Sequence, residues 1–510
     1  MRHVGIDVGG TNTDAVLLER DQVLFSVKTP TTRDVTSGVT RALDDLLRTS
    51  RANPAQIDAV MIGTTHFTNA VVQRQGLTPV AAIRIGLPAA RTLEPFVDWP
   101  PDLARLVRGR IFLLRGGHEV DGRPIVPFDR VAMRRVAREV RDAGLRSVGV
   151  TSAFSPLDPS CEEEARAILR EECPDAAVTV SHDLGRIGLL ARENVTLLNA
   201  CLIDLARATT RAFTRALEAS GIRSALYLTQ NDGTVMRADY AEAFPVYSFA
   251  SGPTNSMRGA AFLSGATHAI VVDVGGTTCD IGCLRNGFPR EANNVIHVGG
   301  VRTLFRMPDL LSFGLGGGTL IDPSDPSRIG PRSVGYELIE RARVFGGSEL
   351  TATDVGVAAG LIELGDRDRV AALPASFVKA TLARIHAMIE EGVDRMKSDA
   401  ADLPLIAVGG ASFLIPDGLP GISEVITVPH HAVANAVGAA IAQVSGEVDQ
   451  IFQNMSRDDA IAEARRVAAE RAVSAGADPA TLEAIEVEDL PLAYLPGNSL
   501  RVRVRVVGDI

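Results

Sequence analysis

The sequence contains Asp-Val-Gly-Gly-Thr twice, at residues 7–11 and again at residues 273–277. Each copy lies between two short apolar runs, which predicts a strand, a glycine turn and a second strand. One such turn is weak evidence of function, because many tight turns use glycine only to reach positive φ. Two copies with the same preceding aspartate predict two similar lobes, each presenting one hairpin to a shared cleft.

A hairpin of this kind is suited to binding phosphate. Without side chains at its tip, backbone N–H groups can contact phosphate oxygens directly. The preceding carboxylate would repel a phosphate unless a magnesium ion lay between them, so Asp7 and Asp273 are predicted to be magnesium ligands. The predicted phosphate-binding residues are Gly9, Gly10, Thr11, Asn12, Thr13, Gly275, Gly276, Thr277 and Thr278.

Length, charge and cysteine content exclude several classes of protein. The 510 residues exceed the roughly 250–300 at which single cores stop growing, so two or more domains are expected. A formal charge of −10 argues against a nucleic-acid partner, which needs clustered lysine and arginine. Without a signal-peptide pattern or an uncharged run of roughly 18 residues, we expect a cytoplasmic protein that does not enter membranes. Cys279 and Cys283 are expected to be packed thiols.

The pattern of apolar runs and turns divides the chain into three parts. We expect a first lobe over residues 1–188 with an inserted segment at about 86–130, a second lobe over 189–448, and a helix-and-strand extension over 449–510. A long helix is predicted over residues 189–220, and a later helix that ends at Gly446. The alternating run "LRVRVRVVG" predicts a strand whose arginines face water.

Other polar or glycine-rich stretches add candidate ligand contacts. Thr64, Thr65, His66 and Asn69 follow a buried strand, where open α/β sheets bind ligands, so substrate contact is favoured over a helix cap. His66 is not favoured as a general base, whose identity stays open. Arg192 and Asn194 interrupt an apolar helix, which favours a place facing the cleft. Lys28 is left open between a phosphate contact and a solvated charge.

The two hairpins resemble the phosphate motifs of the actin-like ATPase fold, which sugar kinases and heat-shock ATPases share. The run "PLIAVGGAS" at residues 404–412 is similar to the adenosine motif of that superfamily. This resemblance implies that Gly409 and Gly410 let the backbone approach the adenine and ribose. It also implies an α/β, two-lobed fold of duplicated ribonuclease H-like domains with a central nucleotide cleft.

A closer resemblance is to the ATP-binding, A-type subunit of the hydantoinase/oxoprolinase family. It is carried by "GIDVGGTNTD", "GTTHFTNAVVQRQG", "LLARENVTLLNACL", "DVGGTTCDIG", "FGLGGGTLI", "VPHHAVANAVGAA" and "PLAYLPGNSLRVRV", in this order along nearly the whole chain. The family position assigns Gly316, Gly317 and Gly318 to a close backbone approach to nucleotide or substrate. The chain departs from the family at "SGPTNSMRG", where Ser-Gly-Pro-Ala-Gly-Gly is common, and at Thr277 to Asp280, where Thr-Ser-Thr-Asp is frequent.

The family resemblance implies an ATP-dependent hydrolase subunit. Its substrate would be a cyclic amide of the hydantoin, 5-oxoproline or lactam type, activated by phosphorylation of the carbonyl oxygen. The cofactors would be ATP and Mg²⁺, the catalytic carboxylates Asp7, Asp273 and Asp280, and the partner a B-type subunit in a hetero-oligomer. Three alternatives remain: an ATP-dependent ketone carboxylase subunit, a sugar or polyol kinase, and a non-catalytic nucleotide switch. The ring, the partner and the stoichiometry are not determined.

Overall fold

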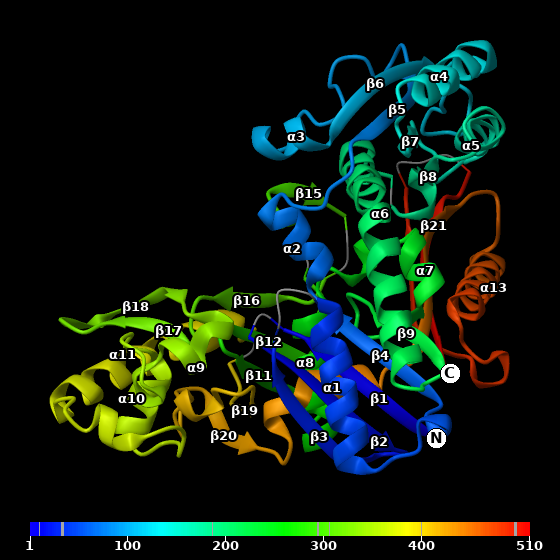
Figure 1. The fold of residues 1–510 in the computed structure, drawn as a ribbon. Helices are drawn as coiled ribbons and strands as arrows, with labels where there is room; N and C mark the ends of the chain where they lie inside the picture. The colour runs from blue at the N-terminus through cyan, green and yellow to red at the C-terminus, as the bar shows by residue number, and fades with distance from the viewer. Residues whose placement is uncertain are drawn as a thin grey trace.

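The computed structural model describes residues 1–9, 11–31, 35–185, 187–292, 295–304, 307–398, 400–493 and 497–510. They form two lobes that meet at a pair of helices, and a smaller domain inserted in the first lobe (Figure 1). Both chain termini lie at the first lobe (Figure 1). This is the two-lobed α/β architecture that the repeated motif predicts.

The first lobe is built on a nine-stranded mixed sheet with helices on both faces. Its strands are β1 (Arg2–Val8), β2 (Asn12–Glu19), β3 (Gln22–Pro30), β4 (Ala59–Thr64), β9 (Ala225–Thr229), β10 (Val235–Arg237), β21 (Val444–Phe452), β22 (Glu483–Pro491) and β23 (Leu500–Gly508). They are arranged in the order β22-β23-β21-β10-β9-β4-β1-β2-β3. Its helices are α1 (Val35–Ser50), α2 (His66–Gln73), α6 (Leu189–Ala219), α7 (Ala238–Ala243), α12 (Ala434–Ala440) and α13 (Arg457–Ala475).

Strand β2 shows why this sheet is covered on both sides. Ala15 and Leu17 join the large core that contains α1 and α6, whereas Val16 and Leu18 pack with α12. Successive side chains of a strand point to opposite faces, so an unbroken apolar run requires cover on each. The predicted long helix is confirmed as α6.

The inserted domain is larger than the sequence predicted. It has a four-stranded parallel sheet in the order β6-β5-β7-β8. The helices α4 and α5 pack on this sheet in a core of their own. The insertion therefore spans about residues 80–180 rather than 86–130. Its elements are β5 (Val80–Leu87), α3 (Pro101–Val107), β6 (Arg108–Arg115), α4 (Arg130–Asp142), β7 (Ser147–Ser152), α5 (Ser160–Glu172) and β8 (Ala177–Val180).

The second lobe repeats the local plan of the first around a six-stranded sheet. Its strands are β11 (Ala269–Val274), β12 (Cys279–Arg285), β13 (Phe288–Pro289), β16 (Leu310–Phe313), β19 (Leu403–Val408) and β20 (Ile422–Thr427). Two small hairpins accompany it, β14 (Ile296–Val298) with β15 (Val301–Thr303) and β17 (Thr319–Asp322) with β18 (Asp325–Ser333). Its helices are α8 (Ser251–Ser264), α9 (Leu338–Arg341), α10 (Ala352–Ala358) and α11 (Ala375–Met396). Cys279 and Cys283 are buried in its core as free thiols, which confirms the prediction.

Short 3-10 helices connect these elements. They are η1 (Pro54–Gln56), η2 (Ser181–Asp183), η3 (Pro245–Ser248), η4 (Gly335–Glu337), η5 (Arg343–Phe345), η6 (Arg367–Val370), η7 (Ser412–Leu414), η8 (His431–Val433) and η9 (Pro479–Thr481). No helix of the described residues is both long enough and apolar enough to span a membrane.

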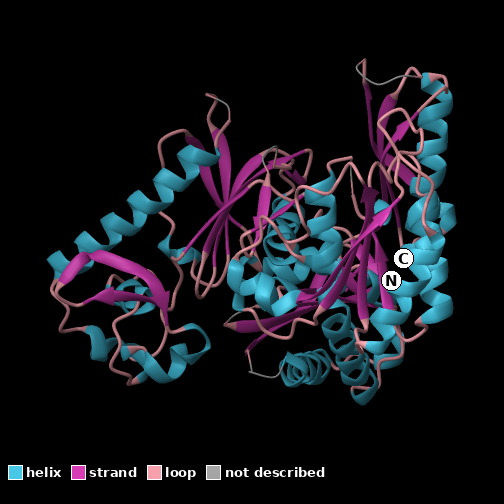
Figure 2. Cartoon of the chain, turned by 90° about the horizontal axis from the view of Figure 1, so that it is seen from above, coloured by secondary structure: helices cyan, strands magenta, loops and turns pink. Residues whose placement is uncertain are grey.

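Helices α8 and α12 join the two lobes, and their backbones touch. A Cβ atom on Gly259 would overlap the Ala434 carbonyl, and one on Gly438 would overlap the Asn255 carbonyl. Helix α8 packs against the second sheet and α12 against the first. Viewed from above, the two sheets lie on either side of a central group of helices (Figure 2). The glycines therefore permit the close crossing on which the two lobes rest.

The expected division of the chain into lobes needs correction. Strands β9 and β10 belong to the first sheet, although they fall within residues 189–448. Strands β21 and β23 extend the same sheet, so residues 449–510 are an integral part of the first lobe. Gly446 lies within β21, where its hydrogen allows the close approach of α13, and does not end a helix. Sequence periodicity cannot reveal such pairing, because it depends on strands distant in the chain.

The arginines of β23 also differ from the prediction. Arg503 and Arg505 are only 4% and 5% exposed, because ion pairs with glutamates on neighbouring segments replace their contact with water. The alternating pattern correctly predicted the strand. It did not predict what would cover its polar face.

Candidate functional site

The two glycine hairpins have the same local structure. In the first, the Gly9 N–H donates to the Asn12 carbonyl at 3.0 Å, and in the second Gly275 donates to Thr278 at the same distance. The strands on either side pair in matching register, Asp7 with Asp14 and Asp273 with Asp280. Gly10 lies outside the described residues. The repeat in the sequence is therefore a repeat in three dimensions.

The hairpins of the two lobes meet. The hydroxyl groups of Thr11 and Thr277 lie 3.3 Å apart. A Cβ atom on Gly276 would overlap the Thr11 side chain, so only glycine allows this approach. Backbone donors from both lobes are thereby brought to one place.

A cavity of about 540 Å³ lies where the hairpins meet. Elements from both lobes line it, and most of the predicted phosphate-binding residues are among them. The predicted residues on its wall are Asp7, Gly9, Thr11, Asn12, Thr65, Asn69, Asp273, Gly275, Gly276, Thr277, Thr278, Asp280, Gly409 and Gly410. We refer to it as the hairpin cavity. Thr13 is fully buried beneath the first hairpin, where its hydroxyl lies 3.4 Å from that of Thr31.

Four carboxylates, those of Asp7, Asp14, Asp273 and Asp280, gather around the hairpin cavity. Burial, with the neighbouring Asp14 and Asp273, raises the pKa of Asp7 to about 8. Burial likewise raises the pKa of Asp280 to about 6, opposed by a hydrogen bond from Ser312. Burial is the main cause of both shifts, and neighbouring carboxylates add to it.

Lys28 supplies a cation to this group. Its ammonium lies 2.8 Å from the Asp14 carboxylate, and it also lines the hairpin cavity. Its charge lowers the pKa of Asp14 against the larger effect of burial, which raises it. The structure thus favours the cavity over the solvent-exposed alternative for Lys28.

The donor set fits a magnesium ion that is shared with phosphates. The Asp7 Oδ1 atom is buried and accepts no hydrogen bond from the described residues. No group of three or more metal-binding side chains in the described part of the chain is arranged as a complete metal site. Mg²⁺ commonly takes one or two carboxylates and completes its shell with water and substrate phosphates. Asp7 and Asp273 remain its predicted ligands.

The glycine run at residues 316–318 supports the second hairpin. The Gly317 N–H donates to the Gly275 carbonyl at 3.0 Å, and Gly318 donates to Gly276 at 2.8 Å. A Cβ atom on Gly316 would lie 2.5 Å from the Thr277 nitrogen. These three glycines face the second hairpin and are not among the residues that line the hairpin cavity. The geometry therefore favours support of the hairpin over the predicted direct approach to a ligand.

Gly409 and Gly410 follow the central strand β19 and line the hairpin cavity. Gly409 has a φ of +92°, and a Cβ atom there would overlap the Asp273 carboxylate. Gly63 lies beside Asp7 in the same way, because a Cβ atom on Gly63 would be 2.8 Å from the Asp7 Oδ1 atom. In both lobes a glycine, Gly63 on β4 and Gly409 directly after β19, therefore leaves room for the aspartate of the neighbouring parallel strand.

The polar turn after β4 is divided between the cavity and the interior. Thr65 and Asn69 line the hairpin cavity, and the Asn69 amide donates to the Thr65 hydroxyl at 3.2 Å. Thr64 is buried and accepts from the His66 N–H at 3.2 Å, in the manner of a turn. Burial lowers the pKa of His66. Of the described residues at this turn, Thr64 and His66 do not reach the cavity wall.

The structure corrects the placement of Arg192 and Asn194. Both are buried in α6, outside the described wall of the hairpin cavity. The Arg192 guanidinium donates to the Ser152 carbonyl at 2.6 Å, and Asn194 accepts from the Trp99 indole at 2.7 Å. Hydrogen bonds to the inserted domain thus offset the desolvation cost that had suggested a cleft.

Three residues at the site were missed by the sequence reasoning. Asp14 could have been found, because it follows Asp7 at the spacing that separates Asp280 from Asp273. Asn435 donates to Asp7 at 2.7 Å from α12, and Ser256 on α8 hydrogen-bonds Asp273. Ser256 falls within the departure "SGPTNSMRG". Neither it nor Asn435 has a spacing signal, since tertiary folding brings them there.

Models of one protein family match most of the chain. The model described as the hydantoinase/oxoprolinase N-terminal region matches residues 3–173, and the one described as hydantoinase/oxoprolinase matches residues 192–366. Together these spans include both hairpins, most of the inserted domain and the glycine run at 316–318.

Curated relatives are similar at a lower level of identity. Caprolactamase subunit alpha of Pseudomonas jessenii is 25% identical over 398 residues, which are 71% of this chain and 55% of the relative. Acetophenone carboxylase gamma subunit of Aromatoleum aromaticum is 27% identical over 500 residues, 86% of this chain and 68% of the relative. The alignment therefore spans only about half of the first relative.

Solved structures share the fold over the full chain. The ATP-dependent caprolactamase from Pseudomonas jessenii superposes with a TM-score of 0.76 at 18% identity, covering 100% of this chain and 88% of that one. Nucleotide-free acetone carboxylase superposes with a TM-score of 0.69 at the same identity and coverage. At this identity the similarity establishes the architecture.

Proposed function

Because the chain belongs to the hydantoinase/oxoprolinase family, we propose that it uses Mg-ATP to activate a cyclic amide by phosphorylating the carbonyl oxygen. The observation that carries the proposal is the meeting of two equivalent Gly-Gly-Thr hairpins beside Asp7 and Asp273. A hydantoin, 5-oxoproline or lactam ring is the substrate class. The names of the caprolactamase relatives support a lactam among these.

The chemistry explains why ATP is needed. Amide resonance makes the ring carbonyl a poor target for water. In the proposed step the carbonyl oxygen attacks the γ-phosphorus, ADP leaves, and the product is an O-phosphorylated imidate. Water then adds to the imidate carbon and the C–N bond breaks, which opens the ring to an amine and an acyl phosphate. A second water attacks the acyl carbon, and the C–O bond to phosphate breaks to release the carboxylate and inorganic phosphate. The protein mainly positions the phosphoryl group and stabilises its charge.

The residues of this chain have distinct proposed tasks. Backbone N–H groups of the two hairpins bind the phosphates from opposite lobes, and Lys28 adds positive charge beside Asp14. Asp7 and Asp273 would hold Mg²⁺, which when bound neutralises phosphate charge. Asp280 is proposed as the third catalytic carboxylate, and Gly409 and Gly410 as the approach to the nucleoside.

An isotope experiment tests the site of phosphorylation. A lactam labelled with ¹⁸O in its carbonyl should transfer the label to inorganic phosphate as the ring opens, with ADP released in equal amount. Unlabelled phosphate from a reaction that does open the ring would contradict carbonyl phosphorylation. ADP release that depends on polyols but not on ring amides would instead assign a kinase, and binding without any turnover would assign a nucleotide switch.

A ketone carboxylase subunit is the second candidate. The alignment to acetophenone carboxylase gamma subunit is longer than that to caprolactamase subunit alpha, 500 against 398 residues. An enolisable ketone would be phosphorylated on oxygen in the same cavity. ADP release that requires both a ketone and bicarbonate would favour this reading over ring opening.

We also propose a B-type partner subunit. Both curated relatives are themselves named as subunits. Coexpression with a B-type protein should yield a stable complex, whereas this chain alone should release little ADP in the presence of a lactam. Full ring opening by the isolated chain would contradict a required partner.

A further inference from the structure

The two oxygens of the Asp7 carboxylate have different surroundings. The Oδ2 atom accepts a hydrogen bond at 2.7 Å from the side-chain amide of Asn435. The Oδ1 atom is buried and accepts no hydrogen bond from any described residue. A buried carboxylate oxygen without a donor is costly, so this arrangement favours a cation as the partner of Oδ1.

Asn435 is held so that its amide nitrogen faces Asp7. It is the second residue of α12, and its Oδ1 atom accepts from the backbone N–H of Ala436 at 3.0 Å. The reversed amide would place this oxygen, which cannot donate, against the carboxylate. The hydrogen-bond pattern therefore selects one orientation of the Asn435 side chain.

Helix α12 lies directly on β1, the strand that carries Asp7. A Cβ atom on Gly5 would be 2.1 Å from the Ala436 carbonyl oxygen, so only glycine permits this contact. Gly5 and Asp7 are two residues apart and share one face of the strand. The close approach that places α12 on Gly5 therefore also brings Asn435 to Asp7.

The crossing with α8 also restrains α12. A Cβ atom on Gly259 of α8 would be 1.8 Å from the carbonyl oxygen of Ala434, the residue before Asn435. Backbones packed this closely leave the first turn of α12 no room to move toward α8. Asn435 is therefore confined by contacts of its helix to both β1 and α8.

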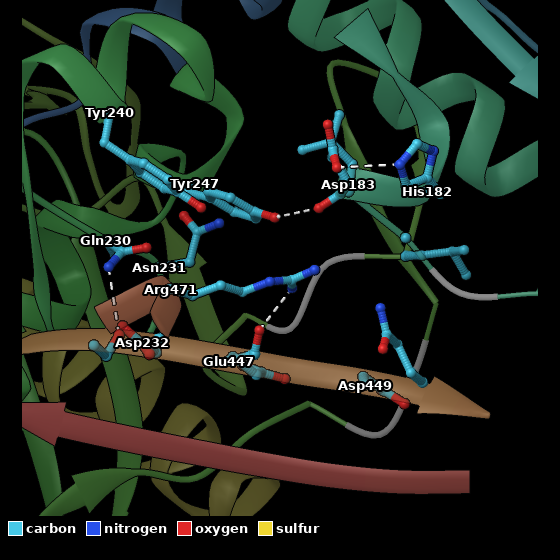
Figure 3. A pocket seen from close by; sticks show the side chains of 16 residues that line it. His182, Asp183, Gln230, Asn231, Asp232, Tyr240, Tyr247, Glu447, Asp449 and Arg471 are labelled. Atoms are coloured by element: carbon cyan, nitrogen blue, oxygen red, sulfur yellow. Dashed lines mark hydrogen bonds and ion pairs between the residues drawn. The ribbon is translucent and has the colours of Figure 1, made fainter. Parts of the chain in front are cut away.

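Helix α8 is anchored to the first lobe at its start and reaches the aspartate of the second lobe. Asn231, on the wall of a pocket of about 140 Å³ at the end of β9 (Figure 3), accepts from the Ala250 N–H at 2.8 Å. Its carbonyl accepts from the Thr254 hydroxyl at 3.0 Å. Two residues further along α8, Ser256 hydrogen-bonds Asp273. Each predicted magnesium aspartate is thus held by a side chain from one of the two crossing helices.

Among the side chains that the structure describes, Asn435 alone donates a hydrogen bond to the Asp7 carboxylate. The ammonium of Lys28, on the same cavity wall, pairs with Asp14 at 2.8 Å instead. Asn435 is therefore the group that sets how the Asp7 carboxylate is turned.

We propose that Asn435 is a positioning residue for the metal site, which engages one oxygen of Asp7 and leaves the other for Mg²⁺, so that nucleotide binding becomes dependent on the metal. Hydrogen-bonding partners of metal ligands typically contribute about 10- to 100-fold to metal affinity. This role rests on the proposed Mg-ATP site at the hairpin cavity, whichever acceptor is phosphorylated there.

Calorimetry on the full chain tests this role with adenylyl imidodiphosphate, an ATP analogue that is not hydrolysed. Its affinity is measured once with Mg²⁺ and once with EDTA, and the ratio of the two affinities is the gain from the metal. Asn435→Ala should reduce that gain about tenfold or more and leave the affinity in EDTA nearly unchanged, because Asp7 contacts the metal rather than the nucleotide. Equal losses in both conditions would show that Asn435 only supports the fold, and would overturn the proposal.

Asn53→Ala is the matched control, because it removes one side-chain hydrogen bond, to the Ala55 N–H at 3.0 Å, at an exposed turn of the first lobe. Its gain from Mg²⁺ should equal that of the unmodified chain. A full gain in Asn435→Ala would overturn the role of Asn435 alone, whereas no gain in the unmodified chain would contradict the magnesium assignment as well. Thermal melting establishes that each variant is folded. Asn435→Ser, whose hydroxyl is one bond too short to reach Asp7, should show the same loss and decides the question if the alanine variant does not fold.

Discussion

The hydroxyl of Thr11 lies 3.3 Å from that of Thr277, although 266 residues separate them in the chain. Each belongs to the hairpin of a different lobe. The contact is allowed because Gly276 has no side chain to push the Thr11 group away. Nucleotide phosphates would therefore be held from two sides, and the position of each hairpin depends on the other.

Gly276→Ala should weaken nucleotide binding by about tenfold, since the added methyl group overlaps Thr11 and separates the hairpin donors from one another. Calorimetry with Mg-ATP measures the change. Gly418→Ala is the matched control, because a Cβ atom there meets no atom within 4 Å. Equal affinity in the two variants would show that the hairpin contact does not matter for binding.

Asp273→Asn should lower ATP turnover by about a hundredfold or more, because an amide cannot supply the charge that holds a divalent cation. Asp7→Asn should behave alike. Removing one charge from a crowded group of carboxylates should meanwhile stabilise the protein in the absence of nucleotide. Metal-dependent ADP release, measured with the best ring substrate and partner, is compared with thermal melting. Asp44→Asn, on the exposed side of α1, should change neither. Near-normal turnover in Asp273→Asn would defeat the magnesium assignment.

The free energy of unfolding without Mg²⁺ should fall as pH rises from about 4 to about 8. Burial raises the pKa of Asp7 from its ordinary 3.8 to about 8, so the folded state holds this proton more tightly than the unfolded chain does. The stability contribution is therefore present below pH 4 and is lost through this window. Urea unfolding at several pH values should show a smaller decline for Asp7→Asn. An identical pH dependence in both proteins would contradict the raised pKa.

Mg-ATP should draw the two lobes together, because a ligand held between domains favours the closed population by its differential affinity. Small-angle scattering should show a smaller radius of gyration with saturating nucleotide. The crossing of α8 and α12 is the proposed pivot. Gly438→Ala should lower the unfolding free energy by about 1–3 kcal/mol, since its methyl group overlaps the Asn255 carbonyl. A scattering curve that nucleotide does not alter would count against closure.

Arg84 and Glu193 form a buried two-point ion pair between β5 and α6, with the Arg84 Nε 2.9 Å from Glu193 Oε1. Arg84→Met should destabilise the protein by about 3–5 kcal/mol, because it leaves the Glu193 charge buried without a partner. The double variant with Glu193→Leu should recover much of that loss. Urea unfolding of both proteins measures it, and equal losses would show that the buried charge is not the cause.

Local signals predicted the hairpins, the cysteines and α6, since each depends on residues near one another in the chain. The spacing of Asp7 and Asp273 from their glycines was enough to place them at one cavity. Long-range pairing was not predictable in this way. Strand β9 was placed in the wrong lobe because its partner β4 lies far away in sequence.

Buried polar residues showed the same limit. Arg192 on an apolar helix was interpreted as facing a cleft, whereas it donates to Ser152 of the inserted domain and to Ser181, which directly follows that domain. Arg503 was expected to face water, yet Glu291, from a segment over two hundred residues earlier, covers it. In each case the sequence revealed an unusual polar side chain but not the distant residue that compensates it.

The first-lobe sheet is assembled from both ends of the chain. Strands β1 to β4 come from the N-terminal end, and β21 to β23 from the C-terminal end complete the same sheet. During synthesis, β10 would form an unpaired sheet edge. Its partner β21 is made only after more than two hundred further residues. The second lobe, contiguous from α8 to β20, can close before that. An unpaired strand edge is prone to pairing with other chains, so the ribosome-bound intermediate is the stage at which this protein would be most exposed to aggregation and to chaperones.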